Sequence, residues 1–496
     1  MASTTETKER MSKTTKQYIH TVIGIAIMLI FWCIPGYDVI TPLGMKCLGA
    51  FLGMIYLWST VGALWPSLLG IIMLGLSGIG GEGPKGFESV FISTFGNKTV
   101  ILLMINMILF GALDVMGCTQ YITRWCLTRK VINGRPYMFL SAVFFTSYVI
   151  SAIVSPPTAV LIVWPITFRM METFKVTKDD KIWHYFFVGL FCVMCLGQPF
   201  FPFKGAQLII VDAIEGFAGT KISWIAWMGY NFIMTFAITA IYILAIKFIF
   251  KPDVSKLKSV TVEQIGESMK LPKISVPQVL FLLSIPIYVL LLLVPNFFSG
   301  VDNAVLKFFN ILGSIGLSAL FCVIFCAIKY QDKPILNFKE VSAKCFNWGT
   351  IFMVAAAIYG AGTLSNDTTG VKEFIIKSLN PILGGQSEIM FVIILFVLAL
   401  ILTNIGNNAG MGLILIPIAG AFCQAIGYPV IPVCVGIGTL VFASILTPAA
   451  SPHAAMMFGK TDIYTGRSII RIGALFCVIS FVLFVAVGYP LAKVMF

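Results

Sequence analysis

Two stretches of this 496-residue chain decide how it folds. Residues 147–166 read SYVISAIVSPPTAVLIVWPI, and residues 397–418 read VLALILTNIGNNAGMGLILIPI. Each lies within an apolar segment that is too long for a single membrane span of about 20 residues. Each is also interrupted near its middle by Pro, Gly or Asn, residues that end or kink helices. The two stretches therefore predict two helical hairpins, each with a break at its tip.

The elements around the two stretches match as well. Aligning Pro165 with Pro417 places residues 155–157 over residues 407–409. The same order of elements occurs in both halves of the chain, which indicates an internal repeat. Paired broken helices at matching positions are typical of the binding site of a secondary transporter. The matched elements are an upstream span (99–117 and 350–370), an amphipathic stretch (119–130 and 371–379), the hairpin (138–171 and 388–426) and a broken helix (184–217 and 428–459).

The composition excludes a soluble protein. Hydrophobic residues make up 58% of the chain and charged residues 11%, with a mean hydropathy of +0.95, whereas soluble domains average about 25% charged residues. The same numbers exclude disorder, a coiled coil, a collagen-like fibre and a secreted disulfide scaffold. We expect an all-α polytopic membrane protein with about 11 transmembrane helices plus two re-entrant hairpins, inverted repeats and an elevator-type mechanism.

The net charge of +13 is explained by topology. If each hairpin enters and leaves on one face and the other segments cross, 25 Lys and Arg residues lie in the cytoplasm and eight outside, which follows the positive-inside rule. The N-terminus is then cytoplasmic, the C-terminus is outside, and the odd number of spans inverts the second repeat. Of the 34 basic residues, only Lys204 has no place in this topology. We expect a location in the plasma (inner) membrane.

The expected organisation has six parts. No nucleic-acid partner is expected, because no aromatic residue interleaves the basic linker. The parts are a cytoplasmic tail (1–17), N-terminal scaffold helices (18–98), repeat 1 (99–250), a cytoplasmic linker (251–276), further scaffold helices (277–347) and repeat 2 (348–496), whose last helix covers 468–494.

The hairpin tips carry residues that can bind an anion. Ser155 can cap the returning half-helix, with Pro156 at its first position, where the missing N–H is no loss. Asn407 or Asn408 can cap the second half-helix in the same way. Each half-helix then directs its positive end toward the middle of the membrane, which suits a substrate with two carboxylates or one compact dianion. The alternative is that the breaks are ordinary kinks supported by neighbouring helices.

These features resemble the divalent anion/sodium symporter (DASS) family, which includes the INDY-type di- and tricarboxylate carriers. That family has a Ser-Asn-Thr motif at each tip, nine residues before a Pro-Ile, and the intervals Pro156–Pro165 and Asn408–Pro417 keep this spacing. Residues 448–459 read PAASPHAAMMFG, close to the family's second broken span. The resemblance covers roughly residues 90–495. It implies an elevator-type carrier of di- or tricarboxylates such as citrate, usually a homodimer, with no enzymatic activity and no cofactor other than sodium ions.

The sequence departs from the family where the resemblance implies sodium sites. Only Ser155 and Asn408 remain of the two tip motifs, and Ala454 stands in place of the Asn in the second broken span. Aligning the two broken spans places Lys204 over His453. Our hypothesis is that the Lys204 ammonium stands where a sodium ion would bind, with His453 as a protonatable counterpart, so that exchange or proton coupling replaces sodium symport. The alternatives are that Lys204 reaches a membrane surface and that His453 is a neutral, hydrogen-bonded residue.

Two sets of candidate site residues follow, with no catalytic residue among them. The expected partners are a small anionic substrate, the lipid bilayer and a second copy of the chain. The expected substrate-binding residues are Ser155, Pro156, Pro157, Thr158, Asn407, Asn408, Ala409, Thr447, Ser451 and His453. The expected cation-site or cation-replacing residues are Gln198, Lys204, Asn404 and Ala454.

Other functions stay open at this point. A sodium-coupled divalent anion symporter of the sulfate type would share these hairpins. A cation/proton antiporter or an arsenite-type carrier of the same superfamily would share them too, but needs a buried carboxylate at the breaks, for which Asp212 is the candidate. An intramembrane enzyme would need a nucleophile–base or metal constellation, and His453 has no evident partner for one.

Overall fold

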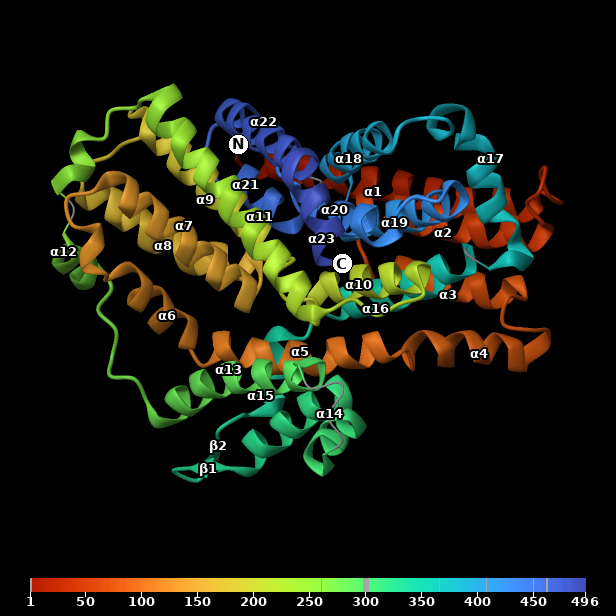
Figure 1. The fold of residues 1–496 in the computed structure, drawn as a ribbon, viewed down its shortest axis with the longest axis horizontal. Coiled ribbons are helices and arrows are strands. Elements are labelled where there is room, and N and C mark those ends of the chain that lie inside the picture. Colours follow the sequence, from red (N-terminus) through yellow and green to blue (C-terminus); the bar gives the residue numbers. More distant parts are fainter. Residues whose placement is uncertain are drawn as a thin grey trace.

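The computed structural model is almost entirely α-helical (Figure 1). It describes residues 2–259, 261–297, 303–364, 366–406, 408–448, 450–460 and 463–496. The first half comprises α1 (Ala2–Cys33), α2 (Pro42–Thr60), α3 (Leu64–Ser77), α4 (Gly83–Phe95), α5 (Lys98–Val115), α6 (Cys118–Leu127), η1 (Lys130–Ile132), α7 (Pro136–Ile153), α8 (Pro156–Thr173), α9 (Lys181–Gly197), α10 (Gly205–Ala218), α11 (Trp224–Leu244) and the π-helix η2 (Ala245–Phe250).

The linker and the second half of the chain are also mainly helical. The linker holds η3 (Ser255–Ser259) and α12 (Val262–Ser268). The second half comprises α13 (Val276–Phe297), α14 (Ala304–Ala327), a hairpin of β1 (Lys329–Tyr330) and β2 (Lys333–Pro334), α15 (Phe338–Cys345), α16 (Trp348–Leu364), η4 (Asp367–Thr369), α17 (Val371–Leu383), α18 (Glu388–Ile405), α19 (Asn408–Ile426), α20 (Val430–Leu440), α21 (Pro452–Gly459), α22 (Gly466–Leu483), η5 (Phe484–Gly488) and α23 (Tyr489–Met495).

The helices are those of a polytopic membrane protein. Among the described residues, nine helices are long and apolar enough to cross a membrane, or ten if α15 and α16, bent by 72°, form one span. This is fewer than the expected count of about 11 spans. The nine include α7 and α18, the first helices of the two hairpins, which were not expected to span. Of the expected spans, α3 has only 14 residues, both broken spans consist of short helices, and α16 counts only together with α15. Residues 2–17 of the expected N-terminal tail form the first part of α1.

The internal repeat is visible in how the helices pack. In both halves, a pair of helices joined by two residues (α7–α8, α18–α19) packs against a helix that ends early (α9, α20). The short helix beyond each break then packs against the returning helix of the other half, α10 on α19 and α21 on α8. The first break begins after Gly197, as predicted. The second begins after Leu440, earlier than the predicted Thr447. Its backbone is held there by the side chain of Asn404.

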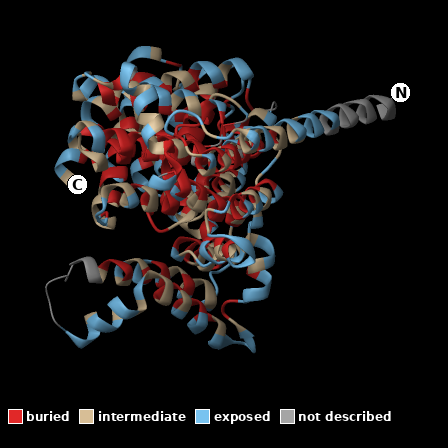
Figure 2. Ribbon diagram, turned by 90° about the vertical axis from the view of Figure 1, so that its right-hand side faces the viewer, coloured by how far each residue is buried: buried red, intermediate tan, exposed pale blue. Residues whose placement is uncertain are grey.

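The buried side chains form two hydrophobic cores. The first core is made by α7–α11 with α18–α23, and the second by α2–α5 with α13–α16. In Figure 2 the buried residues fill the interior of the larger body, and the second core continues into the lobe beneath it. The two cores meet at the first break, because Phe201 and Phe203 belong to the second core while most of α9 belongs to the first.

Candidate functional site

The first hairpin tip is formed as the sequence predicts. Ser155 has an extended backbone and caps α8, accepting a hydrogen bond from the Thr158 N–H at 3.4 Å and sharing one with the Thr158 hydroxyl at 2.9 Å. Pro156 occupies the first helical position, where a residue without an N–H loses no intrahelical bond. Pro157 follows in the same turn. The first turn of α8 keeps no free N–H group at the tip, because Pro156 and Pro157 have none and the N–H groups of Thr158 and Ala159 are bonded to Ser155. The tip therefore offers the positive end of the helix dipole.

Lys204 connects the first break to this tip. It lies just before α10, and its Nζ donates hydrogen bonds to the backbone carbonyls of Ala152, at 2.8 Å, and of Ile153. These carbonyls belong to the last turn of α7, which has no intrahelical donors for them and carries the negative end of the helix dipole. The ammonium also lies 5.0 Å from the centre of the Phe110 ring. Lys204 is therefore a half-buried cation at the tip and does not extend to a membrane surface.

The second break is organised by Asn404. Its carboxamide oxygen accepts from the backbone N–H groups of Ile445 and Leu446, at 2.8 and 2.7 Å. Its amide nitrogen donates to the carbonyl of Leu400 within α18 and to that of Ala443 across the break, at 2.8 and 3.2 Å. The Asn404 carbonyl accepts from the Thr447 hydroxyl at 2.6 Å. One side chain thus satisfies a non-helical segment that would otherwise leave buried polar backbone groups unpaired.

The second tip contacts the end of this break. The N–H of Asn408, the first residue of α19, donates to the carbonyl of Ala450 at 3.3 Å. Ser451 then caps α21, accepting from the Ala454 N–H at 3.1 Å, so this backbone donor is occupied. Ala409 follows within α19, and its side chain lies outside the described residues. The predicted cap Asn407 also lies outside the described residues.

His453 does not occupy the place equivalent to Lys204. Lys204 is the N-cap of the first short helix, α10, and Ser451 is the N-cap of the second, α21. His453 therefore lies two residues beyond the position equivalent to Lys204. Its side chain is 2% exposed, its ring centre lies 5.6 Å from that of Phe191, and within the described chain its Nε2 has no hydrogen-bond partner. Gln198, which ends α9, likewise has a carboxamide oxygen without a partner in the described part. The alignment of the two broken spans was wrong by two residues because the breaks differ in length.

A buried asparagine that the sequence reasoning missed connects the first break to the second core. The Nδ2 of Asn106, on α5, donates to the carbonyl of Phe203 at 2.8 Å. Its Oδ1 accepts from the Tyr288 hydroxyl at 2.9 Å, which shares a hydrogen bond of 2.6 Å with the Ser318 hydroxyl. All three side chains are nearly inaccessible. The signal was present in the sequence, because Asn106 is the one amide in the apolar run 100–112.

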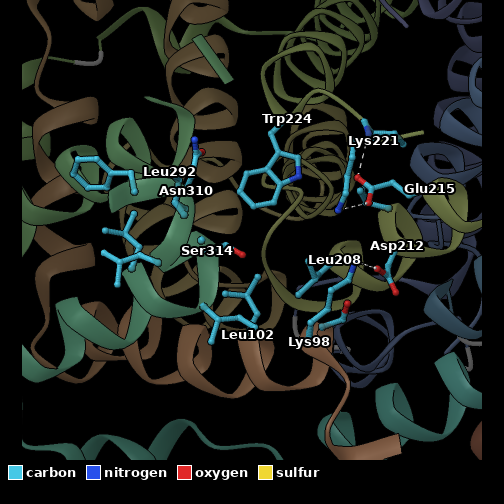
Figure 3. Close-up of a pocket in the computed structure, with 18 of the residues that line it drawn as sticks. Lys98, Leu102, Leu208, Asp212, Glu215, Lys221, Trp224, Leu292, Asn310 and Ser314 are labelled. Carbon is cyan, nitrogen blue, oxygen red and sulfur yellow. Dashed lines mark hydrogen bonds and ion pairs between the residues drawn. The ribbon is translucent and has the colours of Figure 1, made fainter. Parts of the chain in front are cut away.

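Asp212, the carboxylate that an antiporter would need, lies away from the breaks. It is two turns along α10, and its carboxylate forms an ion pair with Lys98 at 3.2 Å. Both line a cavity of about 590 Å³ between α5, α10, α13 and α14. Figure 3 shows Lys98 and Asp212 directed toward one another there, with Glu215 beside Lys221, 3.5 Å apart. The aromatic ring of Trp224 lines the same cavity and packs against Phe203 at 5.3 Å.

The structure thus forms two groups of candidate residues. Lys204 and the Ser155 tip form the first; Asn404, Thr447, Asn408 and Ser451 form the second. The packing of α21 on α8 brings the two capped helices together, but no hydrogen bond joins the two groups within the described residues. Gln198 and His453 belong to neither network.

Comparison with known proteins identifies the family. The family model for the sodium:sulfate symporter transmembrane region matches residues 15–496, nearly the whole chain. The chain belongs to this family. It is the divalent anion/sodium symporter family that the hairpin motifs resemble, so that expectation is confirmed.

Individual relatives of this DASS chain agree with the assignment. An uncharacterized transporter of Methanocaldococcus jannaschii is 21% identical over 325 residues, covering 65% of this chain and 66% of the relative. An uncharacterized transporter of Haemophilus influenzae is 18% identical over 400 residues, covering 80% and 81%. The crystal structure of the Alcanivorax borkumensis YdaH transporter has the same fold, with a TM-score of 0.54 at 12% identity over 90% of this chain and 98% of that one.

These comparisons establish a coarse function. The chain is a multi-pass membrane transporter of the DASS family. The family and the structural neighbour are transporters and not enzymes, which fits the expected class. Among the described residues, no group of three or more His, Cys, Asp or Glu side chains could hold a metal ion.

Proposed function

We propose that this transporter moves di- or tricarboxylates, or a similar divalent anion, across the plasma (inner) membrane by exchange or proton coupling instead of sodium symport. The observation that carries the proposal is the contact between the Lys204 ammonium and the carbonyls of Ala152 and Ile153. At this end of the first hairpin, the family resemblance implies a sodium ion held by an Asn and neighbouring carbonyls. Here a side-chain cation occupies the carbonyls, and no Asn is present at the tip.

A covalently attached cation changes how transport can be coupled. A sodium ion leaves on the far side and so draws on its gradient, whereas the Lys204 charge stays with the protein. Moving the empty site would carry this charge through the membrane interior uncompensated, at a cost of several kcal/mol. A bound dianion largely removes that cost, because its two negative charges are balanced by Lys204 together with the positive ends of α8 and α21, each equivalent to about half a charge. The loaded site therefore moves and the empty site does not, which is the behaviour of an obligatory exchanger.

Two helix N-termini complete the anion site in this proposal. Ser155 and Ser451 begin α8 and α21, and these two helices pack against each other. The positive dipole ends of these two helices attract an oxyanion. The dipole carries this contribution at α8, because Pro156 and Pro157 have no N–H group and the Thr158 N–H is bonded to Ser155. With Lys204 beside the first tip, the site has the positive charge that a dicarboxylate needs. Nothing in it selects among carbon skeletons, so the substrate class extends to tricarboxylates and other divalent anions.

His453 provides the proton-coupled form of the proposal. Its ring is buried on the first turn of α21, and its Nε2 has no partner among the described residues. A proton taken up there together with the substrate would balance one anionic charge. Uptake driven by an acid gradient without counter-substrate would indicate this form, and uptake that needs counter-substrate would indicate exchange.

Sodium-coupled symport of a divalent anion such as sulfate is the second candidate function. It is favoured by the second hairpin, which keeps Asn404 and Asn408 at the positions nearest the family motif. Against it, the Asn404 carboxamide oxygen already accepts two backbone N–H groups and has little capacity left for a cation. A cation/proton antiporter or arsenite-type carrier is disfavoured, because Asp212 is neutralised by Lys98 away from both breaks.

We further propose that the first core moves against the second, in an elevator mechanism and within a homodimer. A polar link across the boundary, the ion pair of Lys98 with Asp212, would then be made in one state and broken in the other. The second core would be the scaffold formed by 18–98 and 277–347, and α7–α8 and α18–α19 would be re-entrant. The distribution of basic residues supports a cytoplasmic N-terminus and an external C-terminus.

Uptake into proteoliposomes tests the proposal. A panel of labelled carboxylates, with sulfate and arsenite included, is measured under a sodium gradient, a proton gradient and preloaded counter-substrate, with protein-free liposomes as control. We expect uptake of a di- or tricarboxylate with counter-substrate or a proton gradient, and none with sodium alone. Sodium-driven sulfate uptake would establish the second candidate, and absence of anion flux in all three conditions would overturn both.

A further inference from the structure

An apolar groove lies on the outside of the first core. It is formed by α6, α7 and α11 and has a volume of about 470 Å³, within the range of small-molecule sites. Its walls include Phe145, Phe232 and Phe236, whose side chains are 44–66% exposed. Helices α7 and α11 are long and apolar enough to span a membrane, so these rings face the bilayer.

One end of the groove is cationic. The Arg129 guanidinium lies 4.1 Å from the centre of the Trp125 ring, and its Nε donates to the Trp125 carbonyl at 2.8 Å. These two contacts fix the side chain at the groove's edge and leave its terminal N–H groups exposed. Within the described chain, no carboxylate forms an ion pair with Arg129. A tryptophan stacked on an arginine at the end of a span is typical of the level of lipid headgroups.

The other end of the groove reaches the transport site. Tyr148 lines this end, and its ring packs edge-on against Phe200 of the first break, 5.8 Å between centres. One turn further along α7 is Ala152, whose carbonyl binds Lys204. From Met138 to Tyr148 the groove follows α7 for about 15 Å, given a rise of about 1.5 Å per residue. An occupant of the groove would therefore contact both the headgroup level and the side chains that support the first break.

We propose that this groove binds one acyl chain of an anionic phospholipid of the cytoplasmic leaflet, with its phosphate on Arg129. The net charge selects the lipid, because the Arg129 guanidinium attracts a headgroup whose phosphate charge is not offset, whereas a choline headgroup carries its own trimethylammonium cation. The basic residues around Arg129 place this end at the cytoplasmic surface, where anionic lipids are concentrated. The inference rests on the topology and not on the substrate or its coupling. A lipid-binding measurement can therefore fail while transport is retained, and the reverse.

Native mass spectrometry of the purified protein with phosphatidylglycerol or phosphatidylcholine tests the inference. We expect one tightly retained phosphatidylglycerol per chain and about tenfold weaker retention of phosphatidylcholine, whose phosphate charge is offset by its own trimethylammonium group. Arg129→Gln should abolish the preference, whereas Lys130→Gln, the same charge change on the next residue, should keep it. Both residues are exposed, so both variants should fold.

A pair of tryptophan variants tests the groove itself. Ala240→Trp fills the groove from α11, and Ile241→Trp adds the same ring to the next residue, which does not line it. We expect Ala240→Trp to lose the retained lipid and Ile241→Trp to keep it. Equal retention of both lipids by the unmodified protein, or retention of phosphatidylglycerol by both Ala240→Trp and Arg129→Gln, would overturn the proposal.

Discussion

The two hairpin tips have the same backbone plan but are stabilised by different chemistry. At the first tip, a lysine from the break donates to the last carbonyls of α7. At the second tip, the donor and acceptor come from the hairpin itself: Asn404, on α18, holds the backbone of the break through both the nitrogen and the oxygen of its carboxamide. The residues at corresponding positions are Ala152 and Asn404, four residues before the aligned pair Pro156 and Asn408.

The difference shows how one repeat can carry a fixed charge and the other a neutral network. Ala152 has no polar side chain that could hold the first break. Its backbone carbonyl, in the last turn of α7, instead accepts a hydrogen bond from the Lys204 ammonium. Asn404 instead holds the second break through a network of neutral hydrogen bonds.

The largest effect is expected from removing the permanent cation. Lys204→Asn leaves the α7 carbonyls without their donor and the substrate without its counter-charge, so uptake under all driving conditions should fall at least about 100-fold. Lys221→Asn makes the same change at an exposed lysine that forms an ion pair with Glu215. This variant is the matched control and should transport normally. Uptake by Lys204→Asn within a few-fold of the unmodified protein would contradict the role assigned to the first tip.

Removing the hydrogen-bond network of Asn404 should lower the stability of the fold more than it changes the coupling of transport. Asn404→Ala leaves two buried N–H groups of the second break without partners and removes a donor from the Ala443 carbonyl, which should cost about 3 kcal/mol or more. Thermal unfolding in detergent measures this as a midpoint several degrees lower. Asn303→Ala, which removes an exposed cap at the start of α14, should have a smaller effect. An unchanged midpoint for Asn404→Ala would show that water replaces the carboxamide.

The capping serines offer a milder comparison of the two tips. Ser155→Ala and Ser451→Ala should each cost about 1 kcal/mol, the usual effect of losing an N-cap. The Ser451 variant should lose more, because Ser451 is 3% exposed and also donates to the Ser444 carbonyl at 3.4 Å, whereas Ser155 is half-buried. Hydrogen exchange of α8 and α21 measures the two effects separately. Protection unchanged in both helices would contradict the capping geometry.

The smallest effect concerns a lysine with an ordinary partner, Lys256. Its ammonium lies 2.7 Å from a carboxylate oxygen of Asp180 and holds the pKa of that carboxyl below its usual range. Since the folded pKa lies below the unfolded value of about 3.9, the pair stabilises the fold above that pH and the stabilisation is lost as pH falls through the folded pKa. At this exposed site the contribution should be below about 1 kcal/mol.

The comparison of unmodified protein with Asp180→Asn measures this pair. The difference between their unfolding midpoints should be small at pH 7 and vanish toward pH 3. A difference that persists at low pH would indicate a contact other than the ion pair.

The sequence predicts those parts of the site that depend on local chemistry. Ser155 followed by Pro156 is a capped helix start wherever it occurs, and the structure has it. The interrupted hydrophobic segments likewise predict two helix pairs and two broken helices at matching positions. Lys204 was isolated because a basic residue inside an apolar segment has no place in the topology.

What the sequence does not predict depends on contacts between distant segments. The length of the second break follows from hydrogen bonds to Asn404, which is about 40 residues earlier in the chain. Aligning Pro199 with Pro448 places His453 opposite Lys204. The N-cap follows the first Pro by five residues and the second by three, so the structure assigns that position to Ser451. The link from Asn106 to the Phe203 carbonyl is also unpredictable, because any buried carbonyl could have been its partner.

The sodium dependence of uptake by Lys204→Gln, compared with the unmodified protein, tests the role of the lysine most directly. Glutamine keeps hydrogen-bond donors on a side chain one atom shorter than that of lysine but removes its charge. We predict that the unmodified protein exchanges its substrate without sodium and that Lys204→Gln loses this exchange. Normal uptake by Lys204→Gln, with the same cation dependence as the unmodified protein, would show that the Lys204 ammonium does not take the place of a sodium ion.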